Sequence, residues 1–189
     1  MRNICLTAVI ALGVVTMLPA FGEQSPPLRV VLSCPLAGGG RATLKAISRG
    51  YEADELFVEI NGKTERAFLD MPNDEFLGQV ALSSCVHNTL IFALEYGPPY
   101  LKGVAIRSNL KTRAIEHLYF SEKALPRWLY LSDDLMQVII PNVGFEVSKR
   151  YIVYEYISGK GQPKESTSTD MLPESRRKLI EIPAPRHHW

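Results

Sequence analysis

The densest group of side chains that could do chemistry is a run of carboxylates between residues 52 and 75. Eight acidic residues stand there against two basic ones, which gives this stretch a local charge of −6. Two such carboxylates flanking a glycosidic bond can cleave it. Alternatively, the run is a docking surface for a cationic partner, or an ordinary solvated face. The catalytic candidates are Glu55, Glu59, Asp70 and Asp74, and the first three are also the candidates for partner binding.

Other catalytic and metal-binding patterns are missing from the sequence. The four histidines and three cysteines include no pair with the spacing of a zinc site. The glycine run 38–40 lacks the lysine of a phosphate-binding loop, and the Gly-x-Ser-x-Gly pattern of serine hydrolases is absent. His117 falls between Ile115 and Tyr119 on one strand face, where we expect a partly buried histidine. The sequence predicts no metal and no cofactor, and it assigns no catalytic residue.

Four aromatic side chains in the second half of the chain could form a binding strip. Aromatic residues with polar tips are enriched at the energetic centres of protein interfaces. They are equally good strand formers, so a half-buried structural role is the alternative. The candidates are Trp128, Tyr130, Tyr154 and Tyr156.

The cysteines predict one covalent constraint. Cys5 lies in the N-terminal leader, which leaves Cys34 and Cys85, each at the end of a strand-like run. An isolated pair of cysteines in an oxidising compartment usually forms a disulfide. A catalytic thiol is the rival interpretation, because His87 is two residues from Cys85. We expect a disulfide between Cys34 and Cys85.

The first 22 residues have the pattern of a secretory signal peptide. Arg2 is followed by an apolar run over residues 4–18 and by small residues at Ala20 and Gly22. We expect cleavage after Gly22. We expect the mature chain in a compartment that permits disulfides, either the periplasm or the exterior of the cell. An uncleaved anchor and a lipid-modified Cys34 are the alternatives. No later stretch approaches the ~20 apolar residues of a membrane helix, so we expect no membrane span after signal removal.

Residues 23–158 are expected to form one mostly β domain, an antiparallel sandwich or meander. Short runs of β-branched, aromatic and alternating residues are separated by Gly, Pro, Asn and Asp at nearly every gap. Two runs that flank Asn61-Gly62 predict a hairpin. The register that we favour has a four-residue loop, 61–64, because a two-residue turn would set charged Lys63 and Glu65 opposite Ile60 and Val58. The predicted strands are 28–33, 41–47, 55–60, 65–70, 78–84, 89–96, 102–107, 114–120, 127–131, 135–140 and 151–157.

The composition changes after Ser158. Residues 159–170 are rich in Gly, Lys, Ser and Thr and show no periodicity, which is typical of a mobile segment. Pro173 suits the first turn of a helix, so a short helix over 173–182 is an option. We expect residues 159–189 to be a flexible C-terminal tail.

Charge and composition limit the function classes. The chain has 21 basic and 20 acidic residues, so no global field attracts it to nucleic acid. We expect an exported, non-catalytic binding protein of a bacterial envelope, of the enzyme-inhibitor or immunity type, whose partner is another protein. The acidic run makes a cationic protein one candidate for that partner. The alternatives are an accessory component of an envelope assembly, docked by its tail, and a small hydrolase that uses paired carboxylates.

Overall fold

The computed structural model describes residues 27–50, 53–144, 147–175 and 178–185. They form antiparallel strands and one short 3-10 turn, η1 (Ala37–Gly39), which confirms the expected mostly β antiparallel fold. The signal-peptide prediction for residues 1–22 lies outside the described residues. The strands are β1 (Arg29–Pro35), β2 (Arg41–Ser48), β3 (Asp54–Ile60), β4 (Lys63–Arg66), β5 (Leu77–Val86), β6 (Thr89–Gly97), β7 (Tyr100–Ser108), β8 (Ile115–Glu122), β9 (Trp128–Leu131), β10 (Leu135–Pro141), β11 (Tyr151–Ile157), β12 (Thr167–Thr169) and β13 (Leu179–Glu181).

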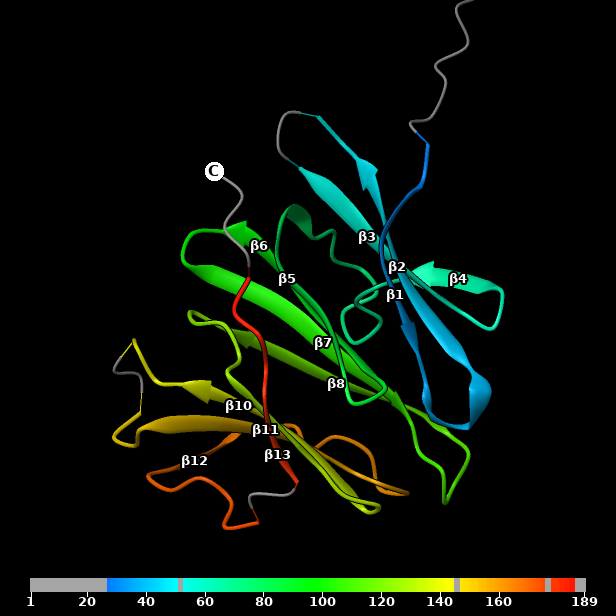
Figure 1. Ribbon diagram of the computed structural model, residues 1–189. Coiled ribbons are helices and arrows are strands. Elements are labelled where there is room, and N and C mark those ends of the chain that lie inside the picture. Colours follow the sequence, from blue (N-terminus) through cyan, green and yellow to red (C-terminus); the bar gives the residue numbers. More distant parts are fainter. Residues whose placement is uncertain (1–26, 51–52, 145–146, 176–177, 186–189) are drawn as a thin grey trace, which may run out of the picture.

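The strands stack in three layers (Figure 1). The first layer holds β1 to β4, the middle layer β5 to β8, and the third layer β9 to β13. The first two layers belong to one eight-stranded sheet, joined where Asp54 and Glu55 of β3 pair with Gly78 and Leu77 of β5. Because this joint is only two residue pairs long, the sheet can fold over on itself and pack its first half on its second.

The two central strands of the middle layer, β6 and β7, are buried on both faces. Leu90, Phe92 and Leu94 of β6 pack into the core shared with the first layer, whereas Ile91 and Ala93 pack into the core shared with the third. All five side chains are fully buried. The sequence of a strand that is covered on both faces is a continuous apolar run and does not alternate with polar residues. The sequence of β6 has this pattern.

The disulfide between Cys34 and Cys85 is present, as expected. It joins the end of β1 to the end of β5, with the two Cα atoms 5.4 Å apart. It therefore fixes β1, the outer strand of the first layer, to the end of β5, whereas the β3–β5 joint lies at the start of β5. The two cysteines are 51 positions apart in the sequence.

A buried polar network fastens the middle layer to the third. Arg107 donates from Nε to Glu116 at 2.7 Å and from a terminal nitrogen to the carbonyl of Ser132 at 2.7 Å. Asn109 donates to the other Glu116 oxygen at 3.0 Å, and the Ser158 hydroxyl donates to that oxygen at 2.6 Å. Every buried polar group of this set has a partner, so the network can hold the β9–β10 turn without the cost of unpaired charge.

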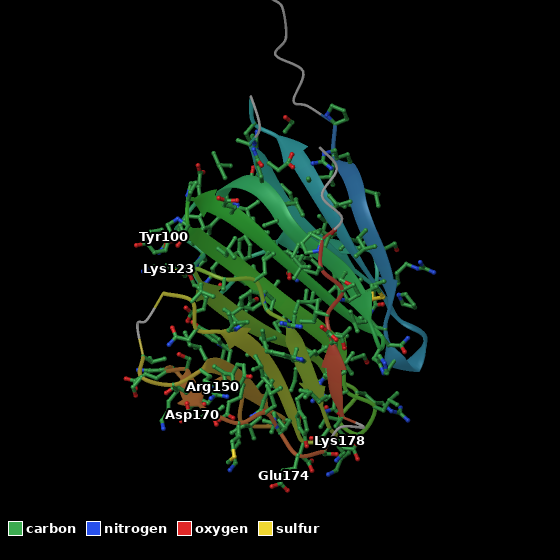
Figure 2. All side chains as sticks on the ribbon, turned by 60° about the vertical axis from the view of Figure 1, so that its left-hand side comes forward. Tyr100, Lys123, Arg150, Asp170, Glu174 and Lys178 are labelled. Atoms are coloured by element: carbon green, nitrogen blue, oxygen red, sulfur yellow. A yellow bond between two sulfur atoms is a disulfide. The ribbon has the colours of Figure 1, made fainter. Side chains whose placement is uncertain are left out.

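Weaker, exposed contacts occur within the middle layer and within the third (Figure 2). The amine of Lys123 lies 5.6 Å from the centre of the Tyr100 ring, which connects the start of β7 to the segment after β8. Asp170 accepts hydrogen bonds from the backbone of Arg150 at 3.2 Å and from the Lys149 amine at 2.6 Å. These exposed contacts tie β12 to the start of β11.

The predicted register of the β3–β4 hairpin is wrong. Asn61 and Gly62 form a two-residue turn with φ of 51° and 84°, and Val58 lies opposite Glu65. β4 is therefore Lys63–Arg66, not the expected 65–70. The charges that argued against this register are tolerated because β4 lies at the border of the first layer. Lys63 is largely exposed there and forms an ion pair with Glu65.

The predicted C-terminal tail and its optional helix are also wrong. β12 pairs with β11 and β13 pairs with β9, so both outer edges of the third layer come from the segment after Ser158. Leu179–Glu181 is a strand, and Ile182 is buried in the second core. Ile180 and Ile182 are two residues apart, the spacing that puts both side chains on one face of an extended chain. The domain therefore extends well past residue 158.

Candidate binding site

The carboxylates singled out in the sequence bind cations of the same chain. Glu55 accepts from Nε of Arg49 at 2.8 Å and lies 3.4 Å from Nε of Arg66. Glu59 accepts from the Lys45 amine at 2.6 Å, and this hydrogen bond lowers the pKa of Glu59. The acidic stretch is thus largely neutralised within the fold, which weakens its case as a docking surface for a cationic partner.

The pocket that three of the acidic residues share is too small for a sugar substrate. Glu55, Asp74 and Glu75 line a common pocket, but its volume is only about 20 Å³ and Arg66 also lines it. That space admits about one water molecule. Arg66 lies 3.5 Å from Glu75 as well, so two of the three carboxylates share one guanidinium instead of facing a substrate.

Asp70 serves a buried amine. Lys102 is only 4% exposed, although it lies in the middle of β7. Its amine forms an ion pair with Asp70 and lies 5.7 Å and 5.9 Å from the ring centres of Phe76 and Tyr119. Since an unpaired buried ammonium is costly, the pairing of Asp70 with Lys102 stabilises the core.

The four aromatic candidates do not form one strip. Tyr154 pairs with Val138, which pairs with Leu129, so these side chains share the face that packs on the middle layer. Tyr156 packs against the same core. Trp128 and Tyr130 alternate with Leu129 and therefore lie on the opposite face.

Two of these aromatics have identifiable structural partners. The Tyr154 hydroxyl contacts the Ser121 carbonyl and a Glu122 carboxylate oxygen, both at 2.9 Å, and burial together with the Glu122 charge raises its pKa. Trp128 packs edge-on against Tyr151, with ring centres 5.3 Å apart. The half-buried structural role considered for these residues therefore applies to both.

A different set of residues lines a mainly apolar recess, which we call the hairpin pocket. Its volume is about 230 Å³. The β3–β4 hairpin and the loop after it form one wall, and β7 and β8 form the other. The lining residues are Val58, Ile60, Lys63, Glu65, Arg66, Ala67, Leu69, Ile106, Ile115, His117 and Tyr119.

The pocket arises from the way the first layer crosses the middle one. β3 begins beside β5, where Asp54 pairs with Gly78, and ends with Ile60 near Ile115 of β8. β3 thus passes diagonally over the middle layer. The two-residue turn brings β4 back along β3 and leaves an opening between β4 and β8.

The polar groups of the hairpin pocket are held in neutral forms or in internal pairs. Burial lowers the pKa of His117, and the nearby Glu65 charge opposes this effect more weakly. Burial, with a smaller contribution from the Asp70 charge, raises the pKa of Tyr119 to about 12. The two rings stack with centres 6.2 Å apart. Near neutral pH the wall therefore offers an uncharged imidazole and an uncharged phenol.

This arrangement suits binding better than bond cleavage. The one carboxylate that lines the hairpin pocket, Glu65, is paired with Lys63, so the lining lacks a carboxylate pair. A mainly apolar interior with a few polar groups at its wall is typical of a recognition site. The sequence predicted only that His117 and Tyr119 lie on the same face of one strand, and the structure confirms this. The β4 residues that line the pocket could not be predicted, because the predicted register of the hairpin was wrong.

Among the described residues, no group of three or more His, Cys, Asp or Glu side chains could hold a metal ion. In the same part of the chain, no helix has the length and apolarity needed to cross a membrane. Comparison with protein-family models, with curated proteins and with solved structures gives no match to this chain.

Proposed function

We propose that this chain is an exported, non-catalytic binding protein that holds an apolar side chain of a partner protein in the hairpin pocket. The observation that carries the proposal is an apolar recess open between β4 and β8, with a volume of about 230 Å³. Cavities of roughly 150 Å³ lined by aliphatic side chains bind benzene, so this space is sufficient for one large side chain. A buried anchor of this kind supplies much of the affinity of a protein interface.

Export to an oxidising compartment, the periplasm or the cell exterior, is part of the proposal. The leader pattern of residues 1–22 motivates it, and the disulfide between Cys34 and Cys85 is consistent with it. A small disulfide-closed domain that binds through one recess fits the inhibitor or immunity type of protein. The two alternatives have less support, because the C-terminal segment is built into the third layer and the carboxylates are internally paired.

A capture experiment with a matched pair of variants tests the proposal. Ile60→Trp fills the hairpin pocket, whereas Val30→Trp adds the same ring at an exposed position of β1 that does not line it. We expect the wild type and Val30→Trp to capture the same partner from envelope and culture-medium extracts of the producing cells. Ile60→Trp should lose it. Capture by all three proteins, or by none, would contradict the proposal.

A further inference from the structure

The imidazole of His117 lines the hairpin pocket without a hydrogen-bond partner. It lies between Ile115 and Tyr119 on the face of β8 that packs toward the first layer. Among the residues that the structure describes, no hydrogen bond reaches either ring nitrogen, and neither nitrogen is enclosed by protein. Both nitrogens are therefore open to solvent beside an apolar recess, where the ring can take up and lose a proton.

Glu65 is the charged group that acts on His117 from the opposite wall. The charged residues that line the pocket all come from β4, and they are Lys63, Glu65 and Arg66. Burial lowers the pKa of His117, and the Glu65 carboxylate is the charge that raises it. Arg66 is paired with two carboxylates that do not line the pocket. A proton on His117 would therefore meet one carboxylate across the pocket.

The other groups around His117 are uncharged or compensated. Tyr119 stacks on it from the same strand, and burial raises the pKa of Tyr119 to about 12, so the phenol stays neutral in mild acid. Asp70, in the loop after β4, is paired with Lys102 of β7. The pocket residues of β3 and β7 are aliphatic. Titration of the pocket wall in mild acid therefore centres on His117.

Glu65 has room for a second partner. Lys63 contacts Oε1 of its carboxylate, and no hydrogen bond or ion pair from the described part of the chain reaches Oε2. An ionised carboxylate accepts several hydrogen bonds at once. The side chains of Lys63 and Glu65 are 79% and 40% exposed, and ion pairs of such exposure contribute little stability. Glu65 can therefore accept from a protonated His117 while it keeps Lys63, or in place of it.

We infer that protonation of His117 closes the hairpin pocket, because the imidazolium donates to Glu65 across it and draws β4 toward β8. The pocket then holds an apolar side chain near neutral pH and releases it in acid. The proton comes from solvent and returns to solvent when the pH rises. An apolar occupant also opposes protonation, since it would cover the charged ring and remove its water. This inference rests on the proposed function and adds the regulation of the same pocket.

NMR titration of His117 tests the ion pair with no ligand present. Glu65→Gln removes the proposed partner. Glu59→Gln is the matched control on the same hairpin, because Glu59 binds Lys45 and does not line the pocket. We expect Glu65→Gln to lower the pKa of His117 further, since the charge that raises it is gone, and Glu59→Gln to leave it almost unchanged. An equal shift in both variants, or a shift in neither, would overturn the ion pair.

The same spectra test closure. Below the titration midpoint of His117, the wild type should show nuclear Overhauser contacts between the His117 ring protons and the Glu65 side chain. These contacts should be absent or much weaker above the midpoint. Contacts of equal strength on both sides of the midpoint, or none on either side, would overturn closure.

Toluene, which carries the ring of a phenylalanine side chain, is the probe for release. Its dissociation constant is measured from the methyl signals of Ile60 and Ile106, which both line the pocket. We expect a constant affinity above the titration midpoint of His117 and a loss of up to about tenfold per pH unit below it, the dependence for one proton. In His117→Gln the affinity should change by less than about twofold over the same range. An equal loss in this variant would overturn the inference.

Two outcomes separate this inference from the proposed function. If toluene binds the wild type equally well on both sides of the His117 midpoint, the pocket stands and acid release fails. If toluene leaves the methyl signals of Ile60 and Ile106 unshifted at every pH, release fails because the pocket admits no apolar occupant. Capture of the partner by Ile60→Trp then decides the proposed function separately, and capture equal to that of the wild type means that both fail.

Discussion

Lys102 illustrates at the residue scale how this fold places charge inside a core. Its side chain shares a face of β7 with Val104 and Ile106, both of which are fully buried. The Asp70 carboxylate and the faces of two aromatic rings replace the water that the amine loses. Breaking a buried pair by removing one partner is far more harmful than replacing the pair by apolar groups.

The first prediction concerns this pair. Asp70→Asn removes the charge that compensates Lys102 and should lower the free energy of unfolding by about 2–4 kcal/mol, somewhat less than for a fully buried pair because Asp70 is partly exposed. Urea unfolding monitored by fluorescence measures the change. The control is Glu59→Gln, which removes the partner of Lys45. The lysine and the carboxylate of that pair are more exposed than Lys102 and Asp70, respectively, so the effect on stability should be much smaller. Equal losses in both variants would show that Lys102 does not depend on Asp70.

The second prediction concerns His117. Because burial holds its pKa below the ordinary histidine value of 6.5, the unfolded chain takes up a proton more readily than the folded one. The stability that neutral His117 contributes is therefore complete above pH 6.5 and declines as the pH falls below it. His117→Gln should make the free energy of unfolding less dependent on pH between about 7 and 5.5. An unchanged pH dependence in the variant would contradict this account.

At this scale the sequence predicts the covalent chemistry better than the ionic contacts. Two remaining cysteines can pair in one way, so the bond between Cys34 and Cys85 was predictable. The role of a carboxylate depends on which cation lies beside it. The partner of Glu59 comes from the neighbouring strand and that of Asp70 from 32 positions further along the chain. Charge counts along the sequence cannot contain this information.

The β3–β4 hairpin shows at the element scale that a turn can override side-chain pairing. Asn61 and Gly62 adopt the positive φ values of a tight two-residue turn, whose twist matches that of the strands. The cost of facing charged Lys63 and Glu65 toward the apolar side of β3 is small, because the two residues pair with each other at a solvent-open border. Charge at a strand border was the consideration missing from the predicted register.

The third prediction tests the turn. Gly62→Ala puts a side chain on a residue with φ of +84° and should lower the free energy of unfolding by about 1–2 kcal/mol. Gly97→Ala is the matched control, since no atom lies within 4 Å of the added carbon there and the φ is not in the left-handed region. Denaturant midpoints of the two variants provide the comparison. Similar midpoints would argue that the turn does not hold Gly62 in this conformation.

The fourth prediction concerns the C-terminal segment. Ile182 is 4% exposed in the second core, whereas Met171 is 76% exposed in the same segment. Ile182→Ala should lower the free energy of unfolding by about 2–4 kcal/mol, and Met171→Ala should change it by less than about 0.5 kcal/mol. Thermal and urea unfolding measure both. A neutral Ile182→Ala would restore the expectation of a tail that is independent of the fold.

Long elements of this fold were predictable from sequence and short ones were not. The three strands β6 to β8 and the β9–β10 hairpin follow from alternating or continuous apolar runs between turn residues. β12 and β13 have three residues each, too few to show a period. They are strands because the edges of β11 and β9 supply backbone partners, and that depends on the assembled sheet.

At the scale of the whole molecule, three layers create one closed side and one open corner. The disulfide holds β1 on β5, and the Arg107 network holds the third layer on the middle one. The hairpin pocket lies elsewhere, between β4 and β8, and the ion pair of buried Lys102 with Asp70 joins β7 to the loop after β4 beside it. The layered class of fold was predictable, but this corner was not, because it depends on the diagonal course of β3 over the middle layer.

Site-specific photocrosslinking tests the central claim most directly. A photoreactive benzophenone amino acid replaces Leu69, which is exposed and lines the hairpin pocket, or Val30, which is exposed outside it. Each protein is irradiated in envelope and culture-medium extracts of the producing cells. The account predicts one specific crosslinked partner at position 69 and none at position 30. No product at position 69, or the same products at both positions, would contradict it.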